Sequence, residues 1–308
     1  RPVASSLNYV AGQTVPNLVT VPLGADGNVD FFNHVGTVDV VADLEGYYAD
    51  QPASATGSFL RTVRPQRLLD TRNANGVTGG RPIGAGGVAP VAVNQAGAPA
   101  NVAAVVLNVT VTAPTATSFL TVYPDGATRP TTSNLNFTTG QTISNLVTVP
   151  VSDGVVDIFN HVGTAHVIAD VEGYYTAPVP IDPTSAATSF TPLPPTRILD
   201  TRTTTGGHDA VIGAGGSATL QVAGTAGIPA GATSVVLNVT GVSPTRTTFL
   251  TVYPDGTTRP GTSDLNVAAG QTVPNMVVVP IGSDGKIDFF NNAGQINVVA
   301  DVTGYFAD

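Results

Sequence analysis

The segment "GQTISNLVTVPVSDGVVDIFNHVGTAHVIADVEGYY", residues 140–175, is built from short runs of β-branched and aromatic residues. Gly, Pro, Asn and Asp separate these runs, a pattern typical of β-strands joined by tight turns. The Asp-Gly pair at 153–154 lies between two runs and supplies the positive φ angles of a type I′ turn, so it predicts a hairpin. No part of the chain shows a sustained helical period.

This segment occurs three times, and the repeats organise the whole chain. Residues 12–48 and 270–306 match it along their length, including Asp-Gly pairs at 26–27 and 284–285. A preceding half occurs only twice, in the pairs "RLLDTR" and "RILDTR" (67–72 and 197–202), "VVLNVT" (105–110 and 235–240) and "FLTVYPDG" (119–126 and 249–256). The layout is therefore half a unit followed by two whole units.

Linkers rich in Pro, Ala, Ser and Thr set the expected boundaries. The expected organisation is a half unit at 1–48, a linker at 49–58, a complete unit at 59–175, a linker at 176–189 and a complete unit at 190–308. About eight short strands in each complete unit predict an all-β fold of tandem β-sandwich or jelly-roll-like units.

Composition excludes several functions. The 308 residues carry a net charge of −9 and contain no cysteine. Neutralising phosphates needs clustered Lys and Arg, so nucleic acid is not an expected partner. Disulfides and thiolate chemistry are impossible without cysteine. No apolar run approaches the about 18 residues of a membrane-spanning helix, so membrane insertion is not expected either.

The repeated motifs together carry a family resemblance. The chain resembles a repeat module of secreted actinobacterial proteins, through the motifs R[LI]LDTR, VVLNVT, FLTVYPDGxxRPxTSxLN, GQTVPN and ADVxGYF; these lie at 67–72, 105–110, 119–136, 140–145 and 169–175 and in their copies. The resemblance implies an exported, non-catalytic module at or near the cell envelope. Such modules look like appendages of cell-wall amidases, subtilisin-like proteases and glycoside hydrolases.

Asp170 and its copy Asp301 are flanked by apolar strand residues, and burying a carboxylate without a partner is costly. The planar guanidinium of arginine suits a carboxylate. We therefore predict structural ion pairs Arg72–Asp170 and Arg202–Asp301. Strand alternation also places Asp170, Glu172 and Tyr174 on one face of the sheet.

Two kinds of site remain open alternatives to a purely structural interpretation. The hairpin carboxylates Asp153, Asp157, Asp284 and Asp288 are weak calcium candidates, because the closing Glu and further oxygens of an EF-hand loop are missing. A loop patch that binds glycan is the second possibility, with the candidate residues Tyr123, Asp125, Arg129, Tyr253, Asp255 and Arg259. The chain has no Trp, and turn formation and packing also explain these residues.

Catalysis is not expected, and no cofactor is expected. His34 and His161 occupy the same repeat position, but Asn292 replaces them in the third copy, and a catalytic or metal-binding role would not survive that exchange. There is no G-x-S-x-G motif. His208 and Asp209, in the non-repeated stretch 203–216, mark the only region where an active site would be sought.

The half unit at 1–48 is too short to bury a core of its own, since a domain of about 50 residues without disulfides is marginal. We expect it to be a fragment of a longer array. Packing on a neighbouring unit, or completion by a strand from another copy of the chain, are the alternatives.

The sequence thus predicts a non-catalytic extracellular repeat module for cell-surface attachment, adhesion, or targeting to cell wall or polysaccharide. A structural stalk or filament subunit and an appendage of a secreted hydrolase are the alternative functions.

Overall fold

The computed structural model describes residues 6–44, 46–48, 58–73, 75–76, 80–94, 98–99, 101–176 and 189–307, and all regular secondary structure in them is β-strand. This confirms the predicted all-β fold. The first eight strands are β1 (Phe59–Asp70), β2 (Val88–Ala92), β3 (Val102–Thr112), β4 (Ser118–Pro124), β5 (Leu135–Phe137), β6 (Ile143–Pro150), β7 (Val155–Asn160) and β8 (His166–Thr176). The others are β9 (Ser189–Asp200), β10 (Ser217–Gln221), β11 (Ala232–Val242), β12 (Thr248–Pro254), β13 (Leu265–Val267), β14 (Thr272–Pro280), β15 (Lys286–Asn291) and β16 (Asn297–Ala307).

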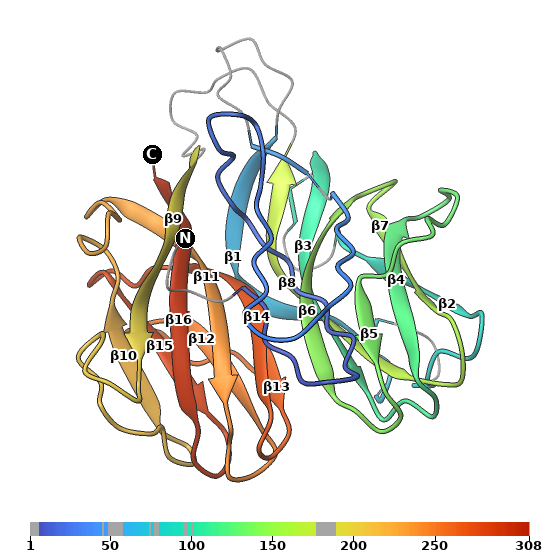
Figure 1. Ribbon diagram of the computed structural model, residues 1–308. Helices are drawn as coiled ribbons and strands as arrows, with labels where there is room; N and C mark the ends of the chain where they lie inside the picture. Colours follow the sequence, from blue (N-terminus) through green and yellow to red (C-terminus); the bar gives the residue numbers. More distant parts are fainter. Residues whose placement is uncertain are drawn as a thin grey trace.

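Each set of eight strands forms a sandwich of two antiparallel sheets (Figure 1). In the first sandwich, residues 59–176, the sheets have the orders β1-β8-β3-β6 and β2-β7-β4-β5. The second sandwich, residues 189–307, has the orders β14-β11-β16-β9 and β10-β15-β12-β13, which match the first when each strand is replaced by its repeat. Alternate strand residues such as Leu107 and Ile158 fill the core between the sheets, and Leu237 and Phe289 do so in the second sandwich.

The hairpin between β6 and β7 turns at Asp153 and Gly154. Both have positive φ, at 49° and 77°, and the amide of Val155 donates to the carbonyl of Ser152 at 2.8 Å. The type I′ turn is confirmed here. The corresponding turn in the second sandwich is one residue longer, and only Gly285 has positive φ there, so the type I′ prediction is wrong at that position.

A β-bulge at Glu172 changes which side chains of β8 face the core. Val171 pairs with Leu107 and Gly173 with Val106, which leaves Glu172 as the extra residue. Because one extra residue reverses the alternation beyond it, Tyr174 is buried in the core of the sandwich. The prediction that Asp170, Glu172 and Tyr174 share one face is therefore wrong for Tyr174.

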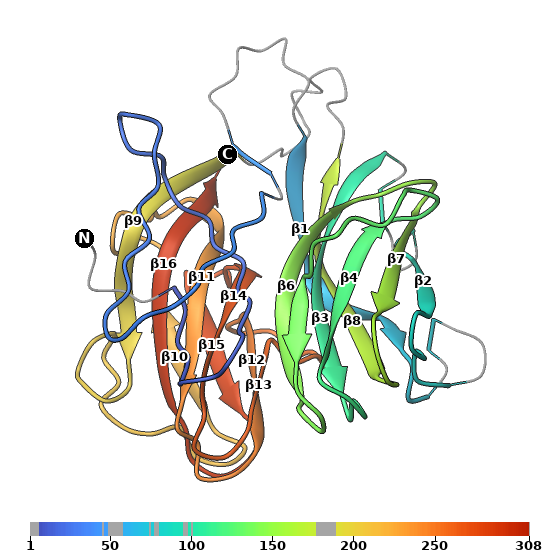
Figure 2. The ribbon, with the colours of Figure 1, turned by 45° about the vertical axis from the view of Figure 1, so that its right-hand side comes forward.

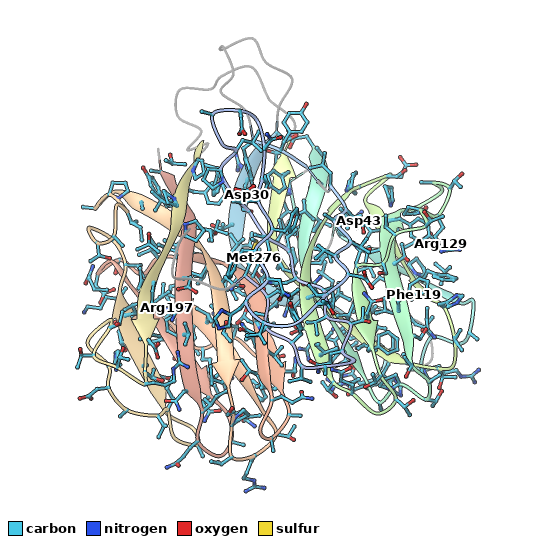
Figure 3. All side chains as sticks on the ribbon, viewed as in Figure 1. Asp30, Asp43, Phe119, Arg129, Arg197 and Met276 are labelled. Atoms are coloured by element: carbon cyan, nitrogen blue, oxygen red, sulfur yellow. The ribbon has the colours of Figure 1, made fainter. Side chains whose placement is uncertain are left out.

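The two sandwiches contact each other through strands β6, β3 and β8 of the first and β13 and β14 of the second (Figure 2). A separate hydrophobic cluster fills this junction, and Figure 3 labels one of its members, Met276, between the two sandwiches. Its buried members are Leu60, Val106, Leu146, Val236, Met276, Val278 and Phe306.

Residues 6–44 and 46–48, here called the N-terminal segment, contain no strand. Figure 1 shows the segment in blue, in front of the two sandwiches where they meet. Its Asp-Gly turn does form, with the amide of Gly24 donating to the carbonyl of Asn28 at 2.9 Å, but only Gly27 has positive φ, so the type I′ prediction is wrong here as well. Leu18 packs against the junction cluster, while most other apolar side chains of the segment are exposed.

Candidate functional site

The repeated arginines and aspartates form ion pairs, but with partners other than those predicted. Arg67 binds Asp170 through two hydrogen bonds, Nε to Oδ1 at 2.9 Å and Nη2 to Oδ2 at 3.1 Å. Arg197 binds Asp301 with the same two distances. The predicted pairs Arg72–Asp170 and Arg202–Asp301 are therefore wrong. The register of β1 against β8 places Arg67, and not Arg72, opposite Asp170.

Arg72 lies beyond the end of β1 and folds back onto Asp70. Its Nε and Nη2 donate to Asp70 at 2.8 and 2.7 Å, and Arg202 binds Asp200 in the same way. The Arg72 guanidinium holds the pKa of Asp70 below its usual value. Burial raises the pKa of Asp170, and the hydrogen bonds from Arg67 oppose that effect. These buried carboxylates stabilise the strand ends and are closed to a ligand.

The outer sheet of each sandwich carries an aromatic and charged patch. In the first sandwich, Phe119 and Tyr123 of β4 and Asp157 and Phe159 of β7 alternate with the core residues of their strands. The Arg129 guanidinium lies over the Phe159 ring, with its Cζ atom 4.1 Å from the ring centroid. We call these five residues the first outer-face patch. Figure 3 shows Phe119 and Arg129 on the side of the sandwich away from Met276.

The second sandwich repeats this arrangement. Its patch, the second outer-face patch, consists of Phe249, Tyr253, Arg259, Asp288 and Phe290. Arg259 lies over the Phe290 ring at 4.0 Å from the centroid. The two phenylalanine rings of each patch are 6.5 and 6.2 Å apart between centroids. The patches differ in their neighbours. His161 stacks on Phe119 with 4.6 Å between the ring centroids, and Asn292 takes its place in the second sandwich. Thr219 donates to Asp288 at 2.6 Å, whereas Pro90 lies opposite Asp157.

The tyrosines and arginines among the predicted glycan candidates belong to these patches, and Asp125 and Asp255 lie beside them, close to Asp157 and Asp288. Arg129 and Asp125 are exposed, whereas the Tyr123 ring is buried and its pKa is raised, first by burial and then by the charge of Asp157. The copies Arg259, Asp255 and Tyr253 follow the same pattern, except that Asp255 is half-buried. The tyrosine rings therefore support the patch from below and do not offer an open face.

Sequence reasoning missed the phenylalanines. Phe119 and its copy Phe249 are partly exposed and border the arginine-covered rings of Phe159 and Phe290. The available signal was the recurrence of Phe at the same two positions in both complete units, one residue before an inward-facing strand residue. Phe119 opens the quoted motif "FLTVYPDG", whose predicted candidates are Tyr123 and Asp125.

The calcium candidates do not form a cation site. No cluster of three or more Asp, Glu or His side chains that could hold a metal ion occurs among the described residues. In the second sandwich, Asp284 instead binds the Lys286 amine at 2.9 Å. His208, singled out as a possible active-site residue, is half-buried, and its Nε2 lies 2.6 Å from the backbone carbonyl of Thr219.

A pair of buried carboxyl groups lies in the junction between the sandwiches. Glu172 and Asp264 are hydrogen-bonded neighbours, and each also accepts from a backbone amide, that of Val278 at 3.4 Å and that of Val252 at 2.7 Å. Burial raises the pKa of Glu172 well above its usual value and that of Asp264 to about 6. Because both groups are buried, the pair belongs to the contact between the sandwiches and not to a ligand site.

Comparisons with known proteins add little. No protein-family model and no curated protein match the chain. A solved structure that matches is the N-terminal CBM22-1-CBM22-2 tandem domain of Xyn10C from Paenibacillus barcinonensis, with 10% identity over 83% of this chain and 99% of that chain, at a TM-score of 0.22. A similarity at that TM-score supports no inference about binding. Within the described residues, no helix has the length and apolar character needed to span a membrane.

Proposed function

We propose that this chain is a non-catalytic module that binds polysaccharide through its two outer-face patches. The observation that carries the proposal is the duplicated stack of an arginine on a phenylalanine, 4.1 Å in one sandwich and 4.0 Å in the other. Beside each stack lie a second, partly exposed ring and an aspartate. An arrangement kept this closely in two copies of the repeat is expected of a binding surface.

The chemistry of the patch suits a sugar. Pyranose rings present apolar C–H faces and several hydroxyl groups, and partly exposed aromatic rings can pack against the former. Arginine offers five N–H donors, and aspartate accepts from hydroxyl hydrogens. Because the Arg129 side chain already lies on the Phe159 ring, less conformational entropy is lost when it binds a hydroxyl.

Two patches on one chain favour a polymer over a small sugar. A patch with few aromatic atoms binds weakly, but two linked sites raise the overall affinity through a high effective concentration. A long polysaccharide can occupy both patches, whereas a monosaccharide occupies only one at a time. We infer that the ligand is an extended glycan, such as a cell-wall polysaccharide.

The proposal places the module outside the cell, as an attachment, adhesion or targeting unit of an actinobacterial type. The repeated motifs support this placement. An appendage of a secreted hydrolase is the form in which such a module would direct a separate catalytic domain to its substrate. The repetition of nearly every polar residue in both units favours a binding role over an asymmetric catalytic one.

Binding to a panel of insoluble peptidoglycan, xylan and β-glucan tests this proposal, measured as depletion of the chain from solution. We expect the chain to bind at least one of them and the double variant Arg129→Gln/Arg259→Gln to lose most of that binding. Arg246→Gln is the matched control, because Arg246 is an exposed arginine in the β11–β12 loop and is a member of neither outer-face patch. Equal binding by all three proteins would overturn the proposal.

A structural stalk or filament subunit is the second candidate function. It is favoured by the exposed apolar side chains of the N-terminal segment, such as Phe31, Phe32 and Leu44, which are suited to contact with further polypeptide. The absence of binding to every polysaccharide, combined with long assemblies in electron micrographs, would favour this function.

A further inference from the structure

The N-terminal segment contacts the second sandwich through a hydrogen bond equivalent to one that joins the second sandwich to the first. Asn275 donates from Nδ2 to Oδ1 of Asn108 at 2.9 Å. Asn17 donates from Nδ2 to Oδ1 of Asn238, also at 2.9 Å. Asn17 and Asn275 occupy the same repeat position, as do Asn238 and Asn108. The two contacts are therefore successive steps of one head-to-tail arrangement.

The junction cluster shows that this arrangement turns around a common centre. Leu18, Leu146 and Met276 are the same repeat position, and all three pack in that one cluster. Tyr48 reaches both neighbours, with its ring centroid 4.2 Å from that of Phe190 and its hydroxyl hydrogen-bonded to that of Tyr175. Three copies of one position meeting at a centre indicate a pseudo-three-fold ring, the form that a head-to-tail contact takes when it closes.

The N-terminal segment occupies the third position of this ring, and its apolar side chains are not covered by strands as those of the two sandwiches are. Leu44 is 84% exposed, whereas the equivalent Val171 and Val302 are both 0% exposed. Phe31 is 68% exposed and its equivalent Phe289 is 0% exposed. In both sandwiches the strands that hold these equivalents, β7 and β8 or β15 and β16, pair only with strands from the first half of the unit. A first half is thus what buries this sequence wherever the structure shows it buried.

The charged residue Asp43 of the N-terminal segment also indicates that a first half is missing. Asp43 is equivalent to Asp170 and Asp301, which bind arginines of the first-half motif R[LI]LDTR. Asp43 is exposed, and no ion pair joins it to any part of the chain that the structure describes. Figure 3 labels it on the N-terminal segment. The arginine that would complete the pair belongs to a first half.

The first sandwich also has one open position in the ring. Asn145 is equivalent to Asn275 and Asn17, and its Nδ2 donates to the carbonyl of Asn134 at 2.7 Å. In the other two contacts, the asparagine from this position meets one from the first-half motif VVLNVT. A further first half would supply that asparagine.

We propose that the exposed face of the N-terminal segment binds a first-half segment of this repeat, a polypeptide with the sequence pattern of residues 59–128, which completes a third sandwich and closes a pseudo-three-fold ring. A second copy of the chain is the less suitable occupant. Both of its first halves already pair with their own second halves, so strands β1–β4 or β9–β12 would have to detach first.

Adding a first half to the full chain tests the proposal. A chain with residues 59–128 duplicated ahead of Arg1, the equivalent of Arg129, is compared with one that carries the same residues in shuffled order, using amide hydrogen exchange of peptides from 14–48. We expect exchange to slow at least tenfold only with the ordered segment. Peptides from 101–176 and 189–307 report whether the two existing sandwiches remain folded. A second addition, with the sequence of residues 189–258, repeats the test should the first not fold.

Unchanged exchange at 14–48 with both ordered segments, while the sandwiches stay protected, would overturn the proposal. Sedimentation of the unmodified chain at several concentrations adds a second readout. We expect a monomer at every concentration. A concentration-dependent oligomer that the substitution Leu44→Asp abolishes would show a second copy on this face and would equally overturn the proposal.

Discussion

Asn275 of β14 and Asn108 of β3 form a hydrogen bond 2.9 Å long across the buried contact between the two sandwiches. Asn275 also accepts from the amide of Leu146 at 3.0 Å and donates to the carbonyl of Asp264 at 2.7 Å. A buried polar network that is fully satisfied fixes one geometry, because displacement leaves several groups without partners. The sandwiches are thus joined by directional bonds as well as by apolar packing.

The variant Asn275→Ala tests how much this network contributes to the stability of the chain. We expect a loss of about 1–3 kcal/mol in the free energy of unfolding, because buried groups on both sandwiches lose their partners. Urea denaturation measures it. Asn145→Ala is the matched control at the same repeat position, where a single hydrogen bond to Asn134 is lost. Equal losses in the two variants would contradict this account of the junction.

The buried pair Glu172–Asp264 makes stability depend on pH. The pKa of Asp264 is raised to about 6 in the folded chain, and that of Glu172 is raised further above its usual value. The folded state therefore binds protons that the unfolded state has released. The contribution of the pair is fully present below about pH 4 and is lost as the pH rises through 6 and above.

The substitution Asp264→Asn removes much of this dependence. Asn134, the equivalent residue, already accepts from the amide of Val122 at 2.8 Å, as Asp264 does from Val252. We expect the variant to be more stable than the parent at pH 8, by on the order of 2 kcal/mol, and similar to it at pH 4. Denaturation across that range measures the difference. A constant difference at all pH values would show that the pair does not titrate as described.

We expect the two kinds of ion pair to contribute different amounts to the free energy of unfolding. Asp301→Ala leaves the partly buried Arg197 with only its longer contact to Asp200, at 3.6 Å, and we expect a loss of about 3–5 kcal/mol. Arg202→Ala removes a half-exposed guanidinium, while the amide of residue 202 still donates to Asp200, so we expect a loss of about 1–2 kcal/mol. Thermal melting orders the two variants, and the reverse order would refute the roles assigned to Arg197 and Arg202.

Local patterns predicted the strands, because side-chain alternation and Asp-Gly turns depend on neighbouring residues alone. The partner of Asp170 depends on the register between β1 and β8, and that of Asp301 on the register between β9 and β16. The residue pattern within a single strand does not determine this register. The bulge at Glu172 is also a product of pairing, and it moves Tyr174 into the core.

Residues of the junction could have been predicted from the positions at which the repeats differ. Glu172 and Asp264 stand where the other unit has Thr303 and Asn134, and such departures mark positions that do different work in each copy. For the outer-face patches the opposite signal was available, since Phe119 and Phe159 recur at the same places as Phe249 and Phe290. Phenylalanine carries no charge, so the pattern of charged residues does not indicate these positions.

The central claim is that the chain carries two equivalent glycan sites. Calorimetric titration with a short oligosaccharide of the polysaccharide that the chain binds tests it most directly. We expect two sites per chain, one in Arg129→Gln or Arg259→Gln alone, and none in the double variant, while Arg246→Gln keeps both. An unchanged number of sites in the double variant, or no binding by the parent chain, would contradict the claim.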